Sequence, residues 1–211
     1  MTENEAHDWL VERFGVSRET YARLESFVAA LIEESGRQNL ISASTVSHIW
    51  ARHIVDSAQL LTLQSTKPDS LWLDLGTGAG FPGIVIAILS ERPVLLVESR
   101  RKRSEFLTRQ AEALGLANVH VHGGRLEMLE TKVAGVISAR AFAPLPKLMT
   151  LAHRFSQKDT VWLLPKGQSV REELESVRGS WQGAFHVKPS LTDADAAIIV
   201  ATGVSPRKNA G

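Results

Sequence analysis

Cysteine is absent from the 211 residues. The chain therefore cannot form a disulfide, offer a thiolate to a metal ion or use a cysteine nucleophile. Long apolar runs are also missing, because no stretch approaches the roughly eighteen apolar residues that a membrane-spanning helix needs. The first seven residues are polar and lack the apolar core of a signal peptide. These absences predict a soluble cytoplasmic protein with no membrane contact and no bound metal.

An excess of charge of either sign is missing as well. The 24 Lys and Arg residues almost balance the 23 Asp and Glu residues, which leaves a net charge of +1. Such a chain has no overall field that attracts a polyanion, so a nucleic-acid surface would have to be a local patch. The hydrophobic share of 44% is enough for one good-sized domain with a small appendage.

The first 66 residues have helical periodicity. Residues recur on one face at a spacing of three to four, which is typical of amphipathic helices. The first set comprises Tyr21, Leu24, Phe27, Val28, Leu31 and Ile32, and the second comprises Val46, Ile49, Trp50, His53, Ile54, Leu60 and Leu61. A hinge-like break follows at 67–70. We expect residues 1–66 to form an N-terminal helical cap on a main domain at 67–204.

Strand-like and helix-like segments alternate through the main domain. The expected strands are 71–75, 94–98, 119–122, 134–138, 160–164, 185–188 and 197–202, and the expected helices are 82–90, 100–115, 125–130, 144–155 and 169–178. This alternation predicts an α/β fold with a seven-stranded, mostly parallel sheet and helices on both faces. The short polar link at 189–196 predicts a terminal hairpin and hence one antiparallel strand. Residues 205–211 are expected to form a flexible tail.

The glycine-rich segment at 71–83 is the most informative stretch. A short apolar strand ends near Asp74, and glycines follow at positions 76, 78, 80 and 83. Glycine lets the backbone turn sharply and approach a ligand, and the next helix offers its first N–H groups. From position 78 the segment matches the dinucleotide pattern G-x-G-x-x-G. From Asp74 it matches acid-x-G-x-G-x-G, the pattern of S-adenosylmethionine loops.

Two features favour S-adenosylmethionine. An acid beside the loop suits a sulfonium cation and repels a pyrophosphate, and the seven strands complete one sheet without a substrate domain downstream. A nicotinamide-dependent oxidoreductase and a glycine turn without a ligand are the alternatives. The candidate donor-binding residues of this segment are Asp74, Gly76, Gly78, Gly80 and Phe81, the last as a wall of the pocket.

Residues at the ends of later strands extend the candidate site. Glu98 ends the second strand, where a carboxylate can accept hydrogen bonds from both ribose hydroxyls, although it could instead cap the next helix. Leu126 and Glu127 follow the third strand, where such folds contact adenine, and ordinary helix initiation is the alternative. Arg140 follows the fourth strand, at the place where donor and acceptor would meet.

A further group of residues is expected to contact RNA. A basic run at 100–103 opens a helix, an unfavourable place for cations, although a charge run is more often a solvated face. An aromatic side chain near Arg140 could stack on a base, and a lysine follows the fifth strand. A histidine in the cap is by itself more often a core residue. The group comprises Arg52, His53, Arg100, Arg101, Arg103, Phe142 and Lys166.

Taken together, these blocks resemble the RsmG (glucose-inhibited division protein B) family of bacterial 16S ribosomal RNA methyltransferases. The matching blocks are 39–42, 52–57, 74–83, 102–103 with 106–107, 125–127, 140–143 and 166–168. The resemblance implies a Rossmann-like class I S-adenosylmethionine-dependent methyltransferase that modifies N7 of a guanine in a hairpin loop of 16S rRNA. It also implies donor contacts at Gly76, Phe81, Leu126, Glu127 and Arg140.

The implied acceptor atom needs no general base, because guanine N7 already carries an in-plane lone pair. We therefore expect Arg140 to orient the reactants and not to act as an acid or a base, with the rate coming from proximity and alignment. The expected partner is 16S rRNA or the 30S subunit, and the protein is expected to be a monomer. A non-catalytic RNA-binding protein that retained the fold is a further alternative.

Overall fold

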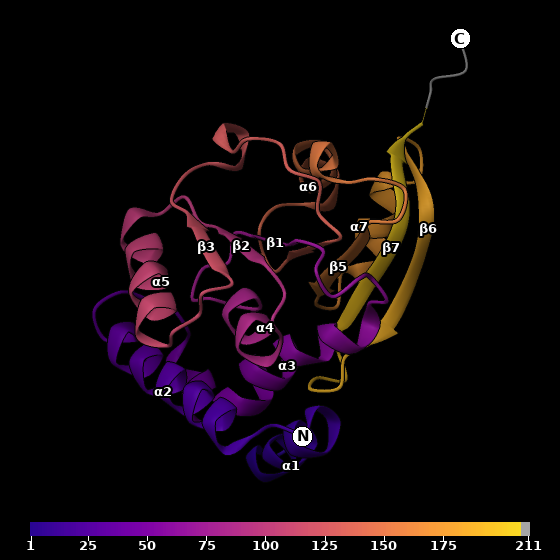
Figure 1. The fold of residues 1–211 in the computed structure, drawn as a ribbon. Coiled ribbons are helices and arrows are strands. Elements are labelled where there is room, and N and C mark those ends of the chain that lie inside the picture. Colours follow the sequence, from indigo (N-terminus) through magenta and orange to yellow (C-terminus); the bar gives the residue numbers. More distant parts are fainter. Residues whose placement is uncertain (208–211) are drawn as a thin grey trace.

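The central feature of the computed structural model, which describes residues 1–207, is a seven-stranded sheet (Figure 1). The strand order is β3-β2-β1-β4-β5-β7-β6. The strands are β1 (Trp72–Leu75), β2 (Val94–Val97), β3 (Val119–His122), β4 (Val136–Ala139), β5 (Val161–Lys166), β6 (Trp181–Pro189) and β7 (Ala197–Pro206). Strands β1 to β5 pair in parallel, and β7 is antiparallel to both of its neighbours. The predicted α/β class, the strand count and the terminal hairpin are confirmed.

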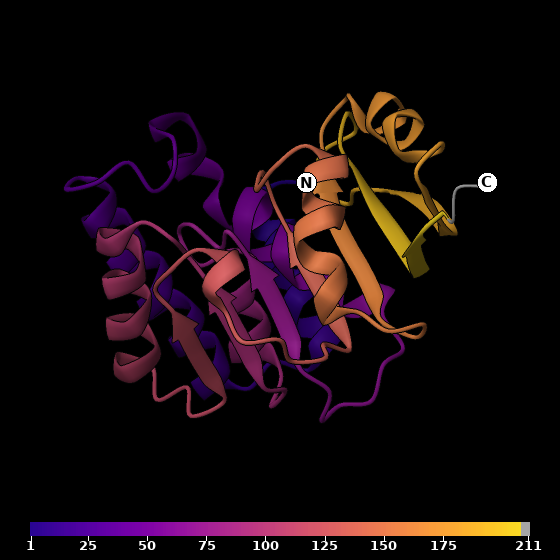
Figure 2. The same cartoon turned by 90° about the horizontal axis from the view of Figure 1, so that it is seen from above.

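Helices cover both faces of the sheet because successive strand residues point to opposite sides. In β1, Trp72 packs into one hydrophobic core and Leu73 into the other. The first core includes residues of α4 (Gly83–Leu89) and α5 (Arg101–Ala113), and the second includes residues of α6 (Leu145–Ala152) and α7 (Val170–Val177). Short 3₁₀ turns lie at Leu126–Met128 and His153–Phe155. Figure 2 shows the two helical layers on either side of the strands.

The N-terminal helices pack on the same face as α4. They comprise α1 (Glu3–Phe14) and α2 (Arg18–Ser35), followed by 3₁₀ turns at Ala43–His48 and Gln59–Leu63, a π-helical turn at Trp50–Val55 and α3 (Asp56–Ala58). Thr2 and Glu5 form a capping box that starts α1. Phe27 of α2 is fully buried in the core that α4 shares. The expected cap is therefore helical, and its boundary at residue 66 stays a prediction.

The C-terminal end differs from the expectation. Strand β7 runs to Pro206, and the Arg207 N–H donates to the Ser180 carbonyl at 2.8 Å. The tail boundary expected at residue 205 is therefore wrong, because it falls inside a paired strand. Residues 208–211 lie outside the described part of the chain. Within residues 1–207, no helix combines the length and the apolar character needed to cross a membrane.

Candidate functional site

The glycine loop leaves the carboxyl end of β1 and turns into α4. Gly76, Gly78 and Gly80 have φ angles of 64°, 59° and 103°, a region that residues with a Cβ rarely adopt. The N–H groups of Gly76 and Thr77 donate to the Val97 carbonyl at 2.8 and 3.2 Å. The loop thus makes the sharp turn that the glycines predict, and backbone hydrogen bonds fix it to the end of β2.

Close packing makes two of these glycines sensitive to substitution. A Cβ on Gly76 would lie 2.6 Å from Cδ2 of the Phe142 ring. A Cβ on Gly83 would collide with Leu96 and lie 2.9 Å from Oδ2 of Asp74. The first glycine therefore lets the loop after β4 approach the loop after β1, and the second lets α4 approach the sheet.

Asp74 is fully buried beneath the glycine loop. Its Oδ2 accepts the Gly83 N–H at 3.0 Å, and its Oδ1 accepts the Ser138 hydroxyl at 2.6 Å. Ser138 in turn accepts the Trp72 indole N–H at 2.8 Å. Burial raises the pKa of the Asp74 carboxyl, while these hydrogen bonds oppose the rise. Both carboxylate oxygens are used inside the protein, so we assign Asp74 to positioning the loop and the start of α4. The expected contact between Asp74 and the donor stays a prediction.

Glu98 lies at the carboxyl end of β2 and is 5% exposed. Its Oε2 accepts the Gly78 N–H at 3.1 Å, and its Oε1 accepts the Arg100 N–H at 2.7 Å. The carboxylate therefore connects the glycine loop to the residue that precedes α5, and its expected contact with the ribose stays a prediction. Leu126 is buried in the 3₁₀ turn after β3, and Glu127 beside it is exposed.

These residues have the chemistry that S-adenosylmethionine requires. In the glycine loop, added side chains would collide with neighbouring residues, so the backbone itself is exposed to a ligand. The Glu98 carboxylate is hydrogen-bonded to this loop, and the apolar Leu126 follows β3. Since β1, β2 and β3 are parallel neighbours, their carboxyl ends meet at one edge of the sheet. The residues present therefore fit the donor that the sequence predicts.

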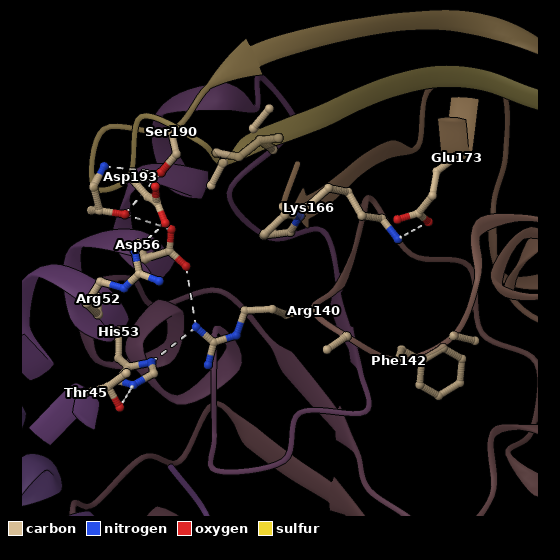
Figure 3. A pocket seen from close by; sticks show the side chains of 18 of the residues that line it. Thr45, Arg52, His53, Asp56, Arg140, Phe142, Lys166, Glu173, Ser190 and Asp193 are labelled. Atoms are coloured by element: carbon tan, nitrogen blue, oxygen red, sulfur yellow. Dashed lines mark hydrogen bonds and ion pairs between the residues drawn. The ribbon is translucent and has the colours of Figure 1, made fainter. Parts of the chain in front are cut away.

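Arg140 occupies the boundary of this edge, immediately after β4 (Figure 3). Its Nη1 lies 3.3 Å from Nδ1 of His53 and 3.4 Å from Oδ2 of Asp56. Its guanidinium carbon lies 5.1 Å from the centroid of the Phe81 ring, a cation–π distance. The next residue, Ala141, has a φ of 52°, uncommon for a residue with a side chain. The side chain is 27% exposed and thus held in place while still accessible.

Phe81 lies under Arg140 and is 2% exposed. The His53 ring stacks on it at 4.9 Å and 12°, and Phe27 meets it edge-on at 5.5 Å. The ring is therefore enclosed by the cap and by Arg140. This arrangement makes it a support for the side chains above it.

A cleft of about 920 Å³ begins on the other side of Arg140. It is lined by segments after β4 and β5, the cap, and the link between β6 and β7. Five predicted residues meet there, namely Arg52, His53, Arg140, Phe142 and Lys166. The sequence reasoning missed the acids Asp56, Glu173 and Asp193 and the hydroxyls Thr45, Ser190 and Thr192, which line the same cleft. Only Asp56 carries a local signal, since it lies at helical spacing from Arg52.

The cleft pairs its cations with acids (Figure 3). Arg52 pairs with Asp193, Arg140 with Asp56, and Lys166 with Glu173, the last at 2.6 Å. Hydrogen bonding to Arg52 lowers the pKa of the Asp193 carboxyl. The lining thus balances three positive and three negative side chains, and Lys166 is only 10% exposed. The arrangement suits a polar, uncharged group better than a phosphate.

The basic run at the start of α5 lies outside the cleft. Arg100, Arg101 and Lys102 are exposed, and Arg101 pairs with Glu105 at 2.7 Å. Arg103 is half-buried and donates to the Asn39 carbonyl at 2.9 Å. The predicted RNA contacts therefore fall into two groups, one in the cleft and one beside the glycine loop.

Comparison with known proteins identifies the family. Residues 20–196 match the GidB family model, described as rRNA small subunit methyltransferase G. A protein named ribosomal RNA small subunit methyltransferase G from Rhizorhabdus wittichii is 58% identical over 209 residues, covering 98% of this chain and 95% of that protein. Its namesake from Zymomonas mobilis is 54% identical, covering 99% and 97%.

Solved structures agree at the level of fold. A crystal structure of a SAM-dependent methyltransferase from Aquifex aeolicus superimposes with a TM-score of 0.60 at 16% identity, covering 80% of this chain and 97% of that one. The Rossmann-like class I methyltransferase fold is confirmed. By the extent and identity of these matches, the chain belongs to the rRNA small subunit methyltransferase G family.

Proposed function

We propose that the protein transfers the methyl group of S-adenosylmethionine to N7 of a guanine in a hairpin loop of 16S rRNA. The observation that carries this proposal is the junction at Arg140, where the glycine-loop edge and the charge-balanced cleft meet in a chain of this family. The donor lies on one side of Arg140 and the acceptor base on the other. Because one chain supplies the whole site, a monomer is sufficient.

The donor side is formed by the backbone of the glycine loop, Glu98 and the turn at Leu126. S-adenosylmethionine, when bound, supplies an electrophilic methyl group carried by a sulfonium. Glu98 accepts hydrogen bonds from the ribose hydroxyls, in keeping with its place at the end of β2 beside Gly78. The loop keeps its shape because its N–H groups donate hydrogen bonds to the Val97 carbonyl and the Asp74 carboxylate.

The acceptor side is the cleft. Its volume of about 920 Å³ lies within the usual range for ligand sites, and its paired ions offer both donors and acceptors to a nucleobase. Guanine presents N7 and O6 as acceptors on one edge. Arg140 donates to O6 and leaves the N7 lone pair directed at the methyl group. This orientation supplies rate through alignment of the reacting atoms.

No side chain at the junction has to remove a proton. Guanine N7 attacks with a lone pair it already has, and the guanidinium of an arginine such as Arg140 donates hydrogen bonds and has no acceptor site for a proton. Burial and the nearby charges of Arg140 and Arg52 lower the pKa of His53 to about 3, so this imidazole is neutral and a poor base. The chemistry of the junction is therefore orientation and exclusion of water.

The phosphates of the RNA lie against the exposed cations at the start of α5. Arg100, Arg101 and Lys102 project from the helix beside the glycine loop, away from the acids of the cleft. A local patch of this kind accounts for RNA binding by a chain whose net charge is +1. The substrate is 16S rRNA or the 30S subunit, which places the enzyme in the bacterial cytoplasm.

The test is methyl transfer from labelled donor to 30S subunits and to deproteinised 16S RNA. Wild type should label one of them at a single guanine, located by primer extension after cleavage at N7-methylguanine. Arg140→Ala should lower turnover about 100-fold, the cost of misaligned reactants. Arg178→Ala is the control, because Arg178 is an exposed arginine that pairs with Glu175 on α7.

Three outcomes separate the alternatives. Absence of labelling with retained donor binding would indicate a non-catalytic RNA-binding protein. Binding of NADH without binding of S-adenosylmethionine would indicate the oxidoreductase. Equal activity of Arg140→Ala and wild type would remove Arg140 from the junction.

A further inference from the structure

His53 makes a directional chain of hydrogen bonds that ends at Arg140. Its Nδ1 lies 3.3 Å from Nη1 of Arg140, and its Nε2 lies 3.1 Å from Oγ1 of Thr45. The Thr45 hydroxyl itself donates to the Ser42 carbonyl at 2.8 Å. A guanidinium can only donate, so Nδ1 must be the acceptor in its bond to Arg140. The Thr45 hydrogen is already used, so Nε2–H donates to the Thr45 oxygen.

This chain specifies one protonation state. His53 has to be neutral, with its hydrogen on Nε2, because a second hydrogen on Nδ1 would face the donor of Arg140. The charged groups around the ring agree with this state. Arg52 and Asp56 lie on its own helical segment, and Arg140 faces it from the loop after β4. Burial, followed by the charges of Arg140 and Arg52, lowers the pKa of His53 to about 3.

Packing fixes the ring as firmly as the hydrogen bonds do. His53 stacks on Phe81 at 4.9 Å and 12°, and the Arg140 guanidinium lies 5.1 Å from the same ring. Phe81 is buried, so it forms a rigid floor for both side chains. Oδ2 of Asp56 accepts from the same Nη1 of Arg140 at 3.4 Å, and Oδ1 of Asp56 accepts from Gln59 and Thr192 at 2.9 and 3.1 Å. Arg140 is thus held from two directions.

We propose that His53 is a positioning residue for methyl transfer, which fixes Arg140 between the glycine loop and the cleft through its neutral Nδ1. The expected effect of His53 on the rate rests on the proposed function. The protonation state of His53 rests on the geometry alone. Without the Nδ1 acceptor, the hydrogen bond that holds Arg140 in the cap is the one to Asp56, whose second oxygen binds Gln59 and Thr192. The guanidinium then turns toward the acids of the cleft and away from guanine O6.

The kinetic experiment compares two replacements of His53. His53→Phe keeps a flat ring on Phe81 and removes the acceptor, whereas His53→Asn keeps an acceptor near the position of Nδ1. We expect His53→Phe to lower kcat/KM for the RNA substrate about 10- to 100-fold. We expect His53→Asn to recover most of that loss, with donor affinity within about twofold of wild type in both. The control is His153→Phe, because His153 also packs against an aromatic ring, that of Trp181 at 5.5 Å.

A double-mutant cycle tests whether His53 acts through Arg140. In an Arg140→Ala background, His53→Phe should cost nothing further, since the residue it positions is gone. Additive losses in the double variant would overturn the inference. So would a His53→Asn variant as impaired as His53→Phe when thermal unfolding shows that both are folded.

The protonation state is tested without any turnover. Nitrogen-15 spectra of the imidazole, recorded between about pH 5 and 8, should show His53 neutral with its hydrogen on Nε2 throughout. In Arg140→Ala the pKa of His53 should rise, because one neighbouring positive charge is removed. A wild-type His53 that titrates near its ordinary pKa would overturn the inference. Absence of methyl transfer with these spectra as expected would instead contradict the proposed function alone.

Discussion

The glycine-loop edge and the cleft adjoin at Arg140, yet they are constructed in different ways. At the loop, two buried acids, Asp74 and Glu98, accept backbone N–H groups of residues that lie at most 20 positions away in the sequence. In the cleft, acids bind side-chain cations, and two of the three pairs join residues that are 84 and 141 positions apart. The glycine-loop edge is held by contacts to the backbone, which fix the path of the chain. The cleft is held by ion pairs between side chains, which can exchange partners with a substrate.

The largest effect in this comparison is expected at Asp74. Asp74→Asn places an amide NH₂ against the Gly83 N–H or the Ser138 hydroxyl, so one buried donor loses its acceptor. We expect a loss of about 3 kcal/mol in the free energy of unfolding, together with weaker donor binding. Chemical denaturation measures the first and calorimetric titration the second. The exposed Asp159→Asn is the control, and equal stabilities of the two variants would contradict the role of Asp74 as a buried support.

A smaller effect, a loss of donor affinity, is expected when Gly76 of the glycine loop is replaced by alanine. The Gly76→Ala methyl group lies 2.6 Å from the Phe142 ring, and the φ of 64° adds backbone strain. We expect S-adenosylmethionine affinity to fall about 10- to 100-fold, which calorimetric titration would detect.

Gly115→Ala is the matched control for the loop variant. Gly115 also has a φ of 64°, but nothing lies within 4 Å of an added Cβ. Gly115→Ala should therefore lower the free energy of unfolding through backbone strain and leave the affinity for the donor unchanged. If Gly76→Ala binds the donor as tightly as Gly115→Ala does, the loop is not the donor site.

The exposed cations of α5 should act on RNA affinity alone. Arg100→Ala and Lys102→Ala each remove one exposed positive charge beside the loop. We expect each to lower the slope of log affinity against log salt by about one and to weaken RNA binding a few-fold, without change in donor affinity. Filter binding over a series of salt concentrations measures this. A salt slope equal to that of wild type in both variants would place the phosphates elsewhere.

The smallest effect on stability is expected for the ion pair at the mouth of the cleft. Arg52 and Asp193 are 45% and 30% exposed, so solvent screens their attraction. Asp193→Ala should change the free energy of unfolding by about 0.5 kcal/mol. It should change KM for the RNA more than kcat, because the link between β6 and β7 loses one of its contacts with the cap. A changed kcat at constant KM would argue against a role in substrate entry.

The same contrast explains what the sequence predicts well. The glycine loop, Glu98 and the strand ends are read from contiguous residues, since turn chemistry and strand alternation are local properties. The parallel sheet follows from the alternation of strands and helices, and the polar link at 189–196 reveals the antiparallel strand. Asp74 is the exception within this region. Its carboxylate accepts hydrogen bonds from the Gly83 N–H and the Ser138 hydroxyl, two contacts that no local pattern in the sequence reveals.

Two of the three ion pairs in the cleft escape prediction because their partners lie far apart in the sequence. Arg52 meets Asp193 across 141 positions of sequence, and no spacing rule connects them. Lys166 and Arg52 are predicted as RNA contacts, Lys166 from its place after the fifth strand, and the structure gives each an acid partner. His53 is predicted as an RNA contact, and the structure places its ring on Phe81 and against Arg140.

Hydrogen–deuterium exchange with and without S-adenosylmethionine tests most directly whether the donor occupies the loop edge and leaves the cleft to the acceptor. Donor alone should slow exchange at 76–81, 98–100 and 126–128, where the backbone of the glycine loop, the start of α5 and the turn after β3 lie. Exchange at 190–196, the link that lines the cleft, should not change. Slower exchange at 190–196 with no change at 76–81 would place the donor in the cleft and contradict this division of the site.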